Sequence, residues 1–198
     1  MFFTTHEQTT PEKILGTAFQ LLSSKGYANV SLRSIAGKAG VALGQVSYHY
    51  HTKEELISSV VRQVTDACVE KLDALICEDM TRRERLLTAA EYFRRLFTEN
   101  RDLARFVVDF TGQAMWTAVY QKQMNAFFTR ISAVLAKGAS EDKNDDLRPN
   151  GGFSAATAAK FAVAALYGTA VEALLGQRAE ETDRVFCYAE HVLLETDI

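Results

Sequence analysis

The apolar residues of this chain recur mostly three and four positions apart, which is the spacing of an amphipathic helix. No stretch shows a sustained alternation of apolar and polar residues, the pattern of a half-buried strand. Proline occurs only at Pro11 and Pro149, so nothing forbids helices over the long interior between them. The pattern therefore predicts an all-α protein of about nine helices.

Capping residues and glycines indicate where these helices begin and end. Thr10 is expected to cap the first helix, with Pro11 in its first position. The segments Thr52–Glu55 and Thr81–Glu84 have the form of capping boxes. A polar, glycine-bearing segment over residues 138–152 is expected to be a mobile loop. With their expected capping residues included, the helices cover residues 10–25, 31–39, 43–50, 52–76, 81–97, 100–137 with a break between 112 and 117, 154–176 and 182–195.

Two of the short helices, joined by the sequence AGVAL, have the spacing of a helix-turn-helix. Ala36 and Ala39 permit the two helices to approach closely, and Gly40 can adopt a positive φ in the turn. In a nucleic-acid reader this unit sets its first helix across the backbone and its second in the major groove. Val46 and Tyr50 can face inward, which turns the other side chains of the second helix outward.

The outward side chains suit contacts to DNA. Gln45 can bond an adenine edge through two hydrogen bonds, and Tyr48 and His49 can donate to phosphate oxygens. Lys53 is expected to meet a phosphate at the N-terminus of the next helix. The residues expected to contact DNA are Ser31, Arg33, Ser34, Leu43, Gly44, Gln45, Ser47, Tyr48, His49 and Lys53.

The stretch GYANVSLRSIAGKAGVALGQVSYHYHTKEEL resembles the DNA-binding domain of the TetR family of transcriptional repressors. The resemblance covers about residues 10–57. Ser47 and Tyr50 stand where the family usually has an aromatic residue and phenylalanine, so base contact at position 47 is expected to differ. The matching pieces are Gly26-Tyr27, Ser31, Ile35-Ala36, Ala39-Gly40-Val41, Tyr48-His49-Tyr50 and Thr52-Lys53-Glu54.

The resemblance implies a three-helix DNA-binding domain over residues 1–52 and a larger helical domain for ligand binding and dimerisation over residues 53–198. It implies a homodimer that represses from a palindromic double-stranded DNA operator and is released by a small molecule. The last two helices carry small and apolar faces that could pair with a symmetry mate, or could be buried within one chain. These faces comprise Ala158, Ala162, Ala165, Tyr167, Thr169, Ala173, Val185, Tyr188 and Val192.

Aromatic residues concentrate between the fifth and the eighth expected helices, where they can line an apolar cavity or form plain core. Asp109, Gln113 or Glu172 could orient a ligand there. We expect an apolar or aromatic effector, chiefly on the strength of the resemblance. The residues expected to line its pocket are Phe93, Phe97, Phe106, Phe110, Gln113, Trp116, Tyr120, Phe127, Phe161 and Tyr167.

Charge supports a polyanionic partner at one end of the chain. The net charge is -3 overall, yet residues 1–53 hold five basic and two acidic residues, a net +3 that leaves -6 for the remainder. The sequence MFFTTHEQTT lacks the features of a leader, and no long uninterrupted apolar run occurs. We therefore expect a cytoplasmic protein without membrane contact.

Other chemistry finds little support in the sequence. His49 and His51 diverge on a helix, and the three cysteines form no C-x-x-C pair, so we expect no metal, cofactor or disulfide framework. A redox-sensing thiol stays an alternative. Because motifs of hydrolases and phosphate-binding loops are missing, we expect no enzyme. The alternatives left open are a ligand-independent regulator, an activator on the same scaffold and an all-α enzyme.

Overall fold

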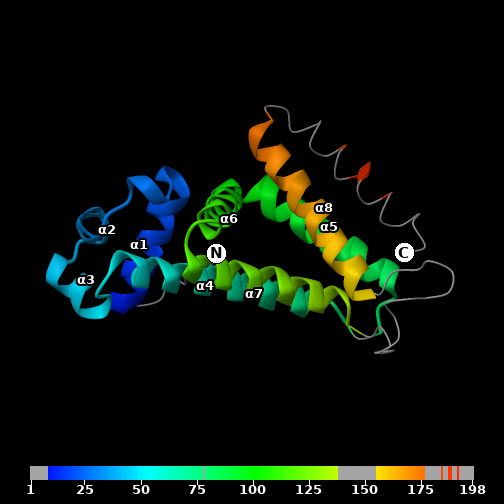
Figure 1. Cartoon of the computed structure of the whole chain (residues 1–198), viewed down its shortest axis with the longest axis horizontal. Helices are drawn as coiled ribbons and strands as arrows, with labels where there is room; N and C mark the ends of the chain where they lie inside the picture. The colour runs from blue at the N-terminus through cyan, green and yellow to red at the C-terminus, as the bar shows by residue number, and fades with distance from the viewer. Residues whose placement is uncertain are drawn as a thin grey trace. The chain divides into compact units, whose positions relative to one another are not determined.

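The computed structural model describes residues 9–77, 79–137 and 155–176, with Arg184, Cys187, Tyr188 and His191 in the final segment. Every regular element in these ranges is helical, which confirms the predicted all-α class (Figure 1). Eight α-helices lie in the described part of the chain, against about nine expected. Most of the expected helix 182–195 and the whole expected loop 138–152 lie outside the described residues.

The chain forms two compact units. The first contains the residues up to Cys68 together with Arg105–Met124, and the second contains Val69–Ala104 together with the residues from Asn125 onward. Three helices contribute residues to both units: α4 (Lys53–Leu75), α6 (Arg101–Ala114) and α7 (Ala118–Leu135). The functional boundary expected after residue 52 stays a prediction, because compactness and function need not divide a chain at the same place.

The first unit contains a cluster of three short helices, drawn in blue to cyan in Figure 1. They are α1 (Thr10–Lys25), α2 (Leu32–Ala39) and α3 (Leu43–His49), with the single 3-10 turn η1 (Tyr27–Asn29) following α1. Burial of each large apolar side chain between them stabilises the folded state by about 1.5–3 kcal/mol relative to leaving it exposed. Their shared core comprises Ile14, Ala18, Leu21, Leu22, Ile35, Ala36, Ala39 and Val46.

The first helix begins one residue earlier than the sequence predicts. Its N-cap is Thr9 rather than Thr10. The Glu12 carboxylate accepts hydrogen bonds from both the backbone N–H and the hydroxyl of Thr9, each at 2.9 Å. Because Glu12 lies three residues after Thr9, it can reach back to this position and not to the next. Pro11 consequently occupies the second helical position rather than the first.

The two other expected capping boxes are present, one with an altered partner. The backbone N–H and hydroxyl of Thr81 donate to Glu84 at 2.7 Å, and the Glu84 N–H donates to Thr81 Oγ1 at 3.3 Å. At the start of α4, the Glu55 N–H donates to Thr52 Oγ1 at 3.0 Å. The Glu55 carboxylate, however, accepts from the N–H of His51, not from that of Thr52.

In the second unit, α5 (Arg82–Glu99) and α8 (Ala155–Leu175) lie side by side (Figure 1). Ala159, Ala162 and Leu166 of α8 are buried, and the small alanines permit close approach of the helices. By length and composition the segment Ala156–Leu175 is also apolar enough to cross a membrane. A core helix of a protein passes the same test, and α8 packs against α5, although only 33% of this segment is buried.

Candidate functional site

The corner between α2 and α3 depends on a glycine in a left-handed conformation. Gly40 has φ 65° and ψ 35°, values that residues with a side chain rarely adopt. The Val41 N–H donates to the Ala36 carbonyl at 3.1 Å, which closes the end of α2. Val46 is fully buried and Tyr50 is nearly so, which confirms that both face inward. This corner fixes the direction in which α3 presents its other side chains.

A row of α3 side chains is exposed to solvent. Tyr48 is 79% exposed and Leu43 is 41% exposed. Gln45 and Ser47 are exposed between them. A Cβ atom added to Gly44 would meet nothing within 4 Å, so packing within the chain does not require glycine there. The outer surface of α3 is therefore open to a partner that approaches its backbone closely.

Gln45 has a local role that sequence reasoning did not foresee. Its Oε1 atom accepts a hydrogen bond from the Ala42 N–H at 3.1 Å. This contact satisfies one of the backbone donors that are left over at a helix start. It occupies the acceptor of the side-chain amide and not the NH₂ donors. A bidentate contact with adenine needs both, so the Gln45 oxygen must either accept a second hydrogen bond or release Ala42 to make it.

Some of the other expected DNA contacts also serve the helix ends in the free protein. Ser31 and Ser34 cap α2 reciprocally, each backbone N–H donating to the other hydroxyl at 3.0 to 3.1 Å. Arg33 is exposed beside them. The His49 ring lies edge-on to Tyr48, with 5.2 Å between the ring centroids. Contact of these residues with DNA stays a prediction.

The Lys53 ammonium is bound within the chain. Its Nζ atom donates to the Tyr27 carbonyl at 2.9 Å and lies 4.2 Å from the centroid of the Tyr27 ring. Burial lowers the pKa of Lys53 below its ordinary value. The ammonium expected to contact a phosphate therefore already has a carbonyl and a cation–π contact, which leave it further donors.

The backbone N–H of Tyr27 is bound within the chain as well as its carbonyl. Its N–H donates to the Asp109 carboxylate at 2.8 Å. Its ring packs edge-on against Phe110 and Tyr120, at centroid distances of 6.0 and 5.8 Å. Burial, and secondarily the neighbouring Tyr27, raise the pKa of Tyr120. We call this set of residues, Tyr27, Lys53, Asp109, Phe110 and Tyr120, the Tyr27 junction.

The ten residues expected to line a ligand pocket are divided between the two units. Phe110 and Tyr120 are fully buried in the Tyr27 junction, whereas Trp116 is 86% exposed. In the second unit, Phe93 and Phe97 stack at 6.1 Å, and Phe161 is 52% exposed. The first unit holds Phe106, Phe110, Gln113, Trp116 and Tyr120, and the second holds Phe93, Phe97, Phe127, Phe161 and Tyr167.

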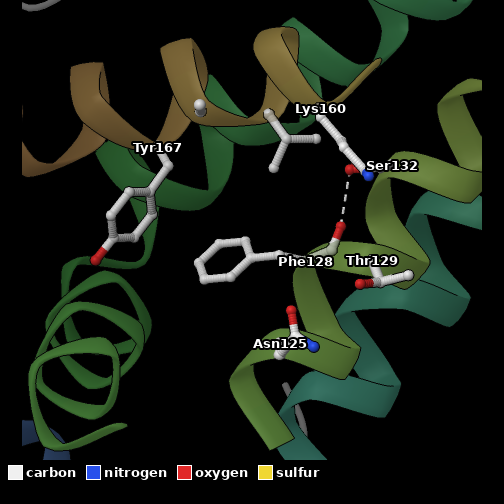
Figure 2. A pocket seen from close by; sticks show the side chains of 8 residues that line it. Asn125, Phe128, Thr129, Ser132, Lys160 and Tyr167 are labelled. Atoms are coloured by element: carbon white, nitrogen blue, oxygen red, sulfur yellow. Dashed lines mark hydrogen bonds between the residues drawn. The ribbon is translucent and has the colours of Figure 1, made fainter. Parts of the chain in front are cut away.

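A cavity of about 440 Å³ lies between α7 and α8 in the second unit (Figure 2). Among the ten expected residues, Tyr167 alone lines it. Its ring meets that of Phe128 edge-on at 5.3 Å. The other lining residues are Asn125, Thr129, Ser132, Lys160, Val163 and Ala164. The helical spacing of Asn125, Thr129 and Ser132 is a signal for a polar face of α7, which a pattern of aromatic residues alone does not contain.

Over the described ranges of the chain, no group of three or more histidine, cysteine, aspartate or glutamate side chains is placed to hold a metal ion. The first unit presents an exposed face of α3, and the second contains a cavity between α7 and α8.

Comparison with known proteins identifies relatives of the N-terminal part. The family described as "Bacterial regulatory proteins, tetR family" matches residues 14–60. The HTH-type transcriptional regulator CymR of Pseudomonas putida is 34% identical over 88 residues, which are 42% of this chain and 43% of that protein. The Fatty acid metabolism regulator protein of Bacillus subtilis is 27% identical over 85 residues, 42% of this chain and 44% of that protein. The alignments thus span less than half the length of these curated relatives.

Solved structures share the fold over nearly the whole chain. A TetR transcription regulator from Haloarcula marismortui has a TM-score of 0.75 at 19% identity, covering 91% of this chain and 94% of that one. FadR from Bacillus subtilis, in complex with stearoyl-CoA, has a TM-score of 0.73 at 16% identity, covering 92% and 97%. A putative regulator from Saccharomonospora viridis, in complex with choline, has a TM-score of 0.73 at 20% identity, covering 94% and 96%. The sequence match and the shared fold agree: residues 14–60 match the DNA-binding part of the tetR family of bacterial regulatory proteins, and the chain has the same fold as solved structures of such regulators.

Proposed function

We propose that this protein is a transcriptional repressor that reads a DNA operator with α3 and leaves it when a small molecule binds. The observation that carries the proposal is the exposed row on α3, where Tyr48 is largely exposed and packing within the chain does not require a glycine at position 44. A helix presented in this way beyond a tight corner fits the major groove. We place its action in the cytoplasm, where operator DNA is found, and propose no catalytic activity.

We propose that two copies bind a palindromic operator through a dimer in which α8 takes part. Phe161, Gly168 and Leu175 are exposed, and their spacing of seven residues places them along one side of α8. A helix with apolar residues on its exposed side as well as its buried side is typical of one covered by a partner. Ala158, Ala162 and Thr169, which the sequence analysis placed on a dimer face, are buried within the chain.

We call helices α1–α3 of one copy its reading head. The release step needs a ligand whose affinity differs between two states of the dimer, in which the two reading heads lie at different spacings. Relatives of known structure support a small-molecule effector, since one was solved with stearoyl-CoA and another with choline. The cavity between α7 and α8 is a candidate site for it. A ligand that favours one state by 1–3 kcal/mol would change operator affinity by roughly 5- to 150-fold.

Selection from a random duplex library tests the proposal. Purified protein is incubated with the library at moderate salt, and bound fragments are sequenced. We expect enrichment of a palindrome whose half-sites lie about one helical turn apart or slightly more. The matched control is Tyr48→Ala, which keeps the fold because the side chain is exposed but should lose the enrichment. Folded, dimeric protein that enriches no sequence, with or without candidate ligands, would contradict the function.

A further inference from the structure

The cavity between α7 and α8 is lined by both apolar and polar side chains. The apolar ones are Phe128, Val163, Ala164 and Tyr167, and the polar ones are Asn125, Thr129, Ser132 and Lys160. In Figure 2 the Tyr167 ring lies at one end of the view, and the Lys160 side chain ends at the other, on the side of Ser132. Asn125, Thr129 and Lys160 are exposed whereas Val163 is buried, so most of the polar lining lies toward solvent. This asymmetry indicates a ligand with a polar head and an apolar body.

The charge of the lining residues selects the sign of that head. Lys160 carries the only full charge among the described residues that line the cavity, and none of them is aspartate or glutamate. An ammonium group donates hydrogen bonds and accepts none. Within the described part of the chain, no ion pair or hydrogen bond engages it. A cationic head would therefore be repelled, and an anionic head would find a partner.

The remaining polar groups favour a carboxylate. The Ser132 hydroxyl already donates to the Phe128 carbonyl at 2.9 Å. Asn125 and Thr129 keep donors that can bind a carboxylate oxygen, which only accepts. One ammonium matches one negative charge, whereas a dianion would leave part of its charge without a counterion in a partly enclosed site.

The size of the cavity limits the apolar body. Since a cavity of about 150 Å³ holds one benzene molecule, a cavity of about 440 Å³ holds roughly 12 to 18 non-hydrogen atoms on the same scale. The edge-on pair of Phe128 and Tyr167 offers ring surface to a flat or extended apolar group.

We propose that the effector of this protein is an apolar monocarboxylate, with its carboxylate at Lys160 and its apolar body against Phe128 and Tyr167. The inference rests on the proposed ligand-released repressor, because it names the class of molecule that this cavity recognises. An anionic effector would distinguish this chain from the structural neighbour that was solved with choline, because choline is a cation.

Calorimetric titration of the full chain with three probes of matched size tests the charge preference. The probes are phenylbutanoate, its neutral amide phenylbutanamide, and the cation phenylbutylamine. Because a hydrogen bond between two charged groups is stronger than one to a neutral group, we expect the carboxylate to bind roughly tenfold or more tightly than the amide. We expect the amine to bind more weakly than either. Equal affinities, a tighter amine, or no binding of any probe at millimolar concentration would overturn the proposal.

Two variants locate the binding. Lys160→Met keeps the apolar stem and should remove the preference for the carboxylate over the amide, leaving amide affinity within about twofold. Lys122→Met, an exposed lysine of α7 outside the cavity lining, is the matched control and should change neither. Ala164→Phe should weaken both ligands by filling the cavity. If Lys160→Met and Lys122→Met behaved alike, Lys160 would not hold the carboxylate.

The titration needs no DNA, so its result is independent of the operator experiment. Protein that enriches an operator but shows no carboxylate preference would overturn this inference and leave the proposed DNA reading intact. Protein that prefers the carboxylate but enriches no DNA would leave the cavity assignment intact and overturn the repressor. If the protein both enriches an operator and prefers the carboxylate, phenylbutanoate should lower the operator affinity of the unaltered protein and of Lys122→Met, but not that of Lys160→Met.

Discussion

At the scale of single residues, several polar side chains of the reading head have two uses. Gln45 caps the start of α3 through its contact with the Ala42 N–H, and it is also our candidate for reading adenine. Lys53 binds the Tyr27 carbonyl, although it is also our candidate for a phosphate contact. Such residues cannot be assigned by a substitution to alanine, because the loss of a helix cap or a packing contact lowers DNA affinity indirectly.

Substitution of Gln45 by glutamate separates the two uses. Gln45→Glu keeps an oxygen that can accept from the Ala42 N–H, so thermal stability should stay within a few tenths of a kcal/mol. It removes the NH₂ donors, so the preference for adenine at the contacted position should fall roughly tenfold or more. Competition binding with operator duplexes that differ at that position measures the effect. An adenine preference that survives Gln45→Glu would assign the readout to another residue.

At the scale of helices, the Tyr27 junction connects the end of α1 with α4, α6 and α7 inside the first unit. Both backbone groups of Tyr27 and its ring are held by side chains from other helices. The position of the reading head within this unit therefore depends on polar contacts as well as on apolar packing.

Removal of the Asp109 carboxylate should weaken this connection. Asp109→Ala leaves the part-buried Tyr27 N–H without its acceptor, so we expect a loss of about 1–3 kcal/mol in the free energy of unfolding. For a chain of this length, that corresponds to roughly 2–4 °C in Tm per kcal/mol. Asp109→Asn keeps an acceptor oxygen, so its free energy of unfolding should fall less than that of Asp109→Ala. Urea unfolding measures the stability, and faster amide exchange at Tyr27 in Asp109→Ala localises the effect. Equal stability of the two variants would exclude the hydrogen bond as the cause.

A surface network on α5 should make stability depend on pH. Glu91 accepts hydrogen bonds from Arg94 at 2.7 Å and Arg95 at 2.6 Å, which lower its pKa to about 2. Because this folded-state pKa lies below the ordinary value of 4.5, the contribution is complete above about pH 5 and is lost as the pH falls toward 2. The group is substantially exposed, so solvent screening limits the contribution to about 1 kcal/mol or less.

Glu91→Gln should therefore be less stable than the unaltered protein at pH 7, and the difference should shrink as the pH approaches 2. Urea unfolding at several pH values measures this convergence. Glu99→Gln, an exposed glutamate of the same helix, is the control and should show no such convergence. A Glu91→Gln difference that is independent of both pH and salt would exclude an electrostatic origin.

At the scale of the whole molecule, regulation requires two reading heads held at a set spacing, and hence a dimer. Phe161→Glu places a charge on the exposed apolar side of α8, so the dimer should dissociate at micromolar concentration. Sedimentation velocity measures the oligomeric state. Ala126→Glu, at an exposed alanine of α7, should stay dimeric. A dimeric, folded Phe161→Glu protein would place the interface elsewhere.

The local sequence determined the elements and the reading head of this protein. Helix starts such as Ser31 and Thr81, and the left-handed Gly40, are recognisable because their hydrogen bonds and backbone angles depend on residues only a few positions apart. The inward positions of Val46 and Tyr50 follow from helical periodicity in the same way. The misplaced cap at Thr10 arose from a choice between neighbouring threonines, which Glu12 decides.

Only the tertiary structure decided which distant residues meet. The Tyr27 N–H finds an acceptor in Asp109, 82 positions along the chain, and periodicity carries no information about such a pairing. For the same reason the aromatic residues of similar spacing became two separate groups. Phe110 and Tyr120 joined the core of the first unit, and Tyr167 joined the cavity of the second. The choice depended on how helices pack against one another, which is set by the shape and volume of all contacting side chains together.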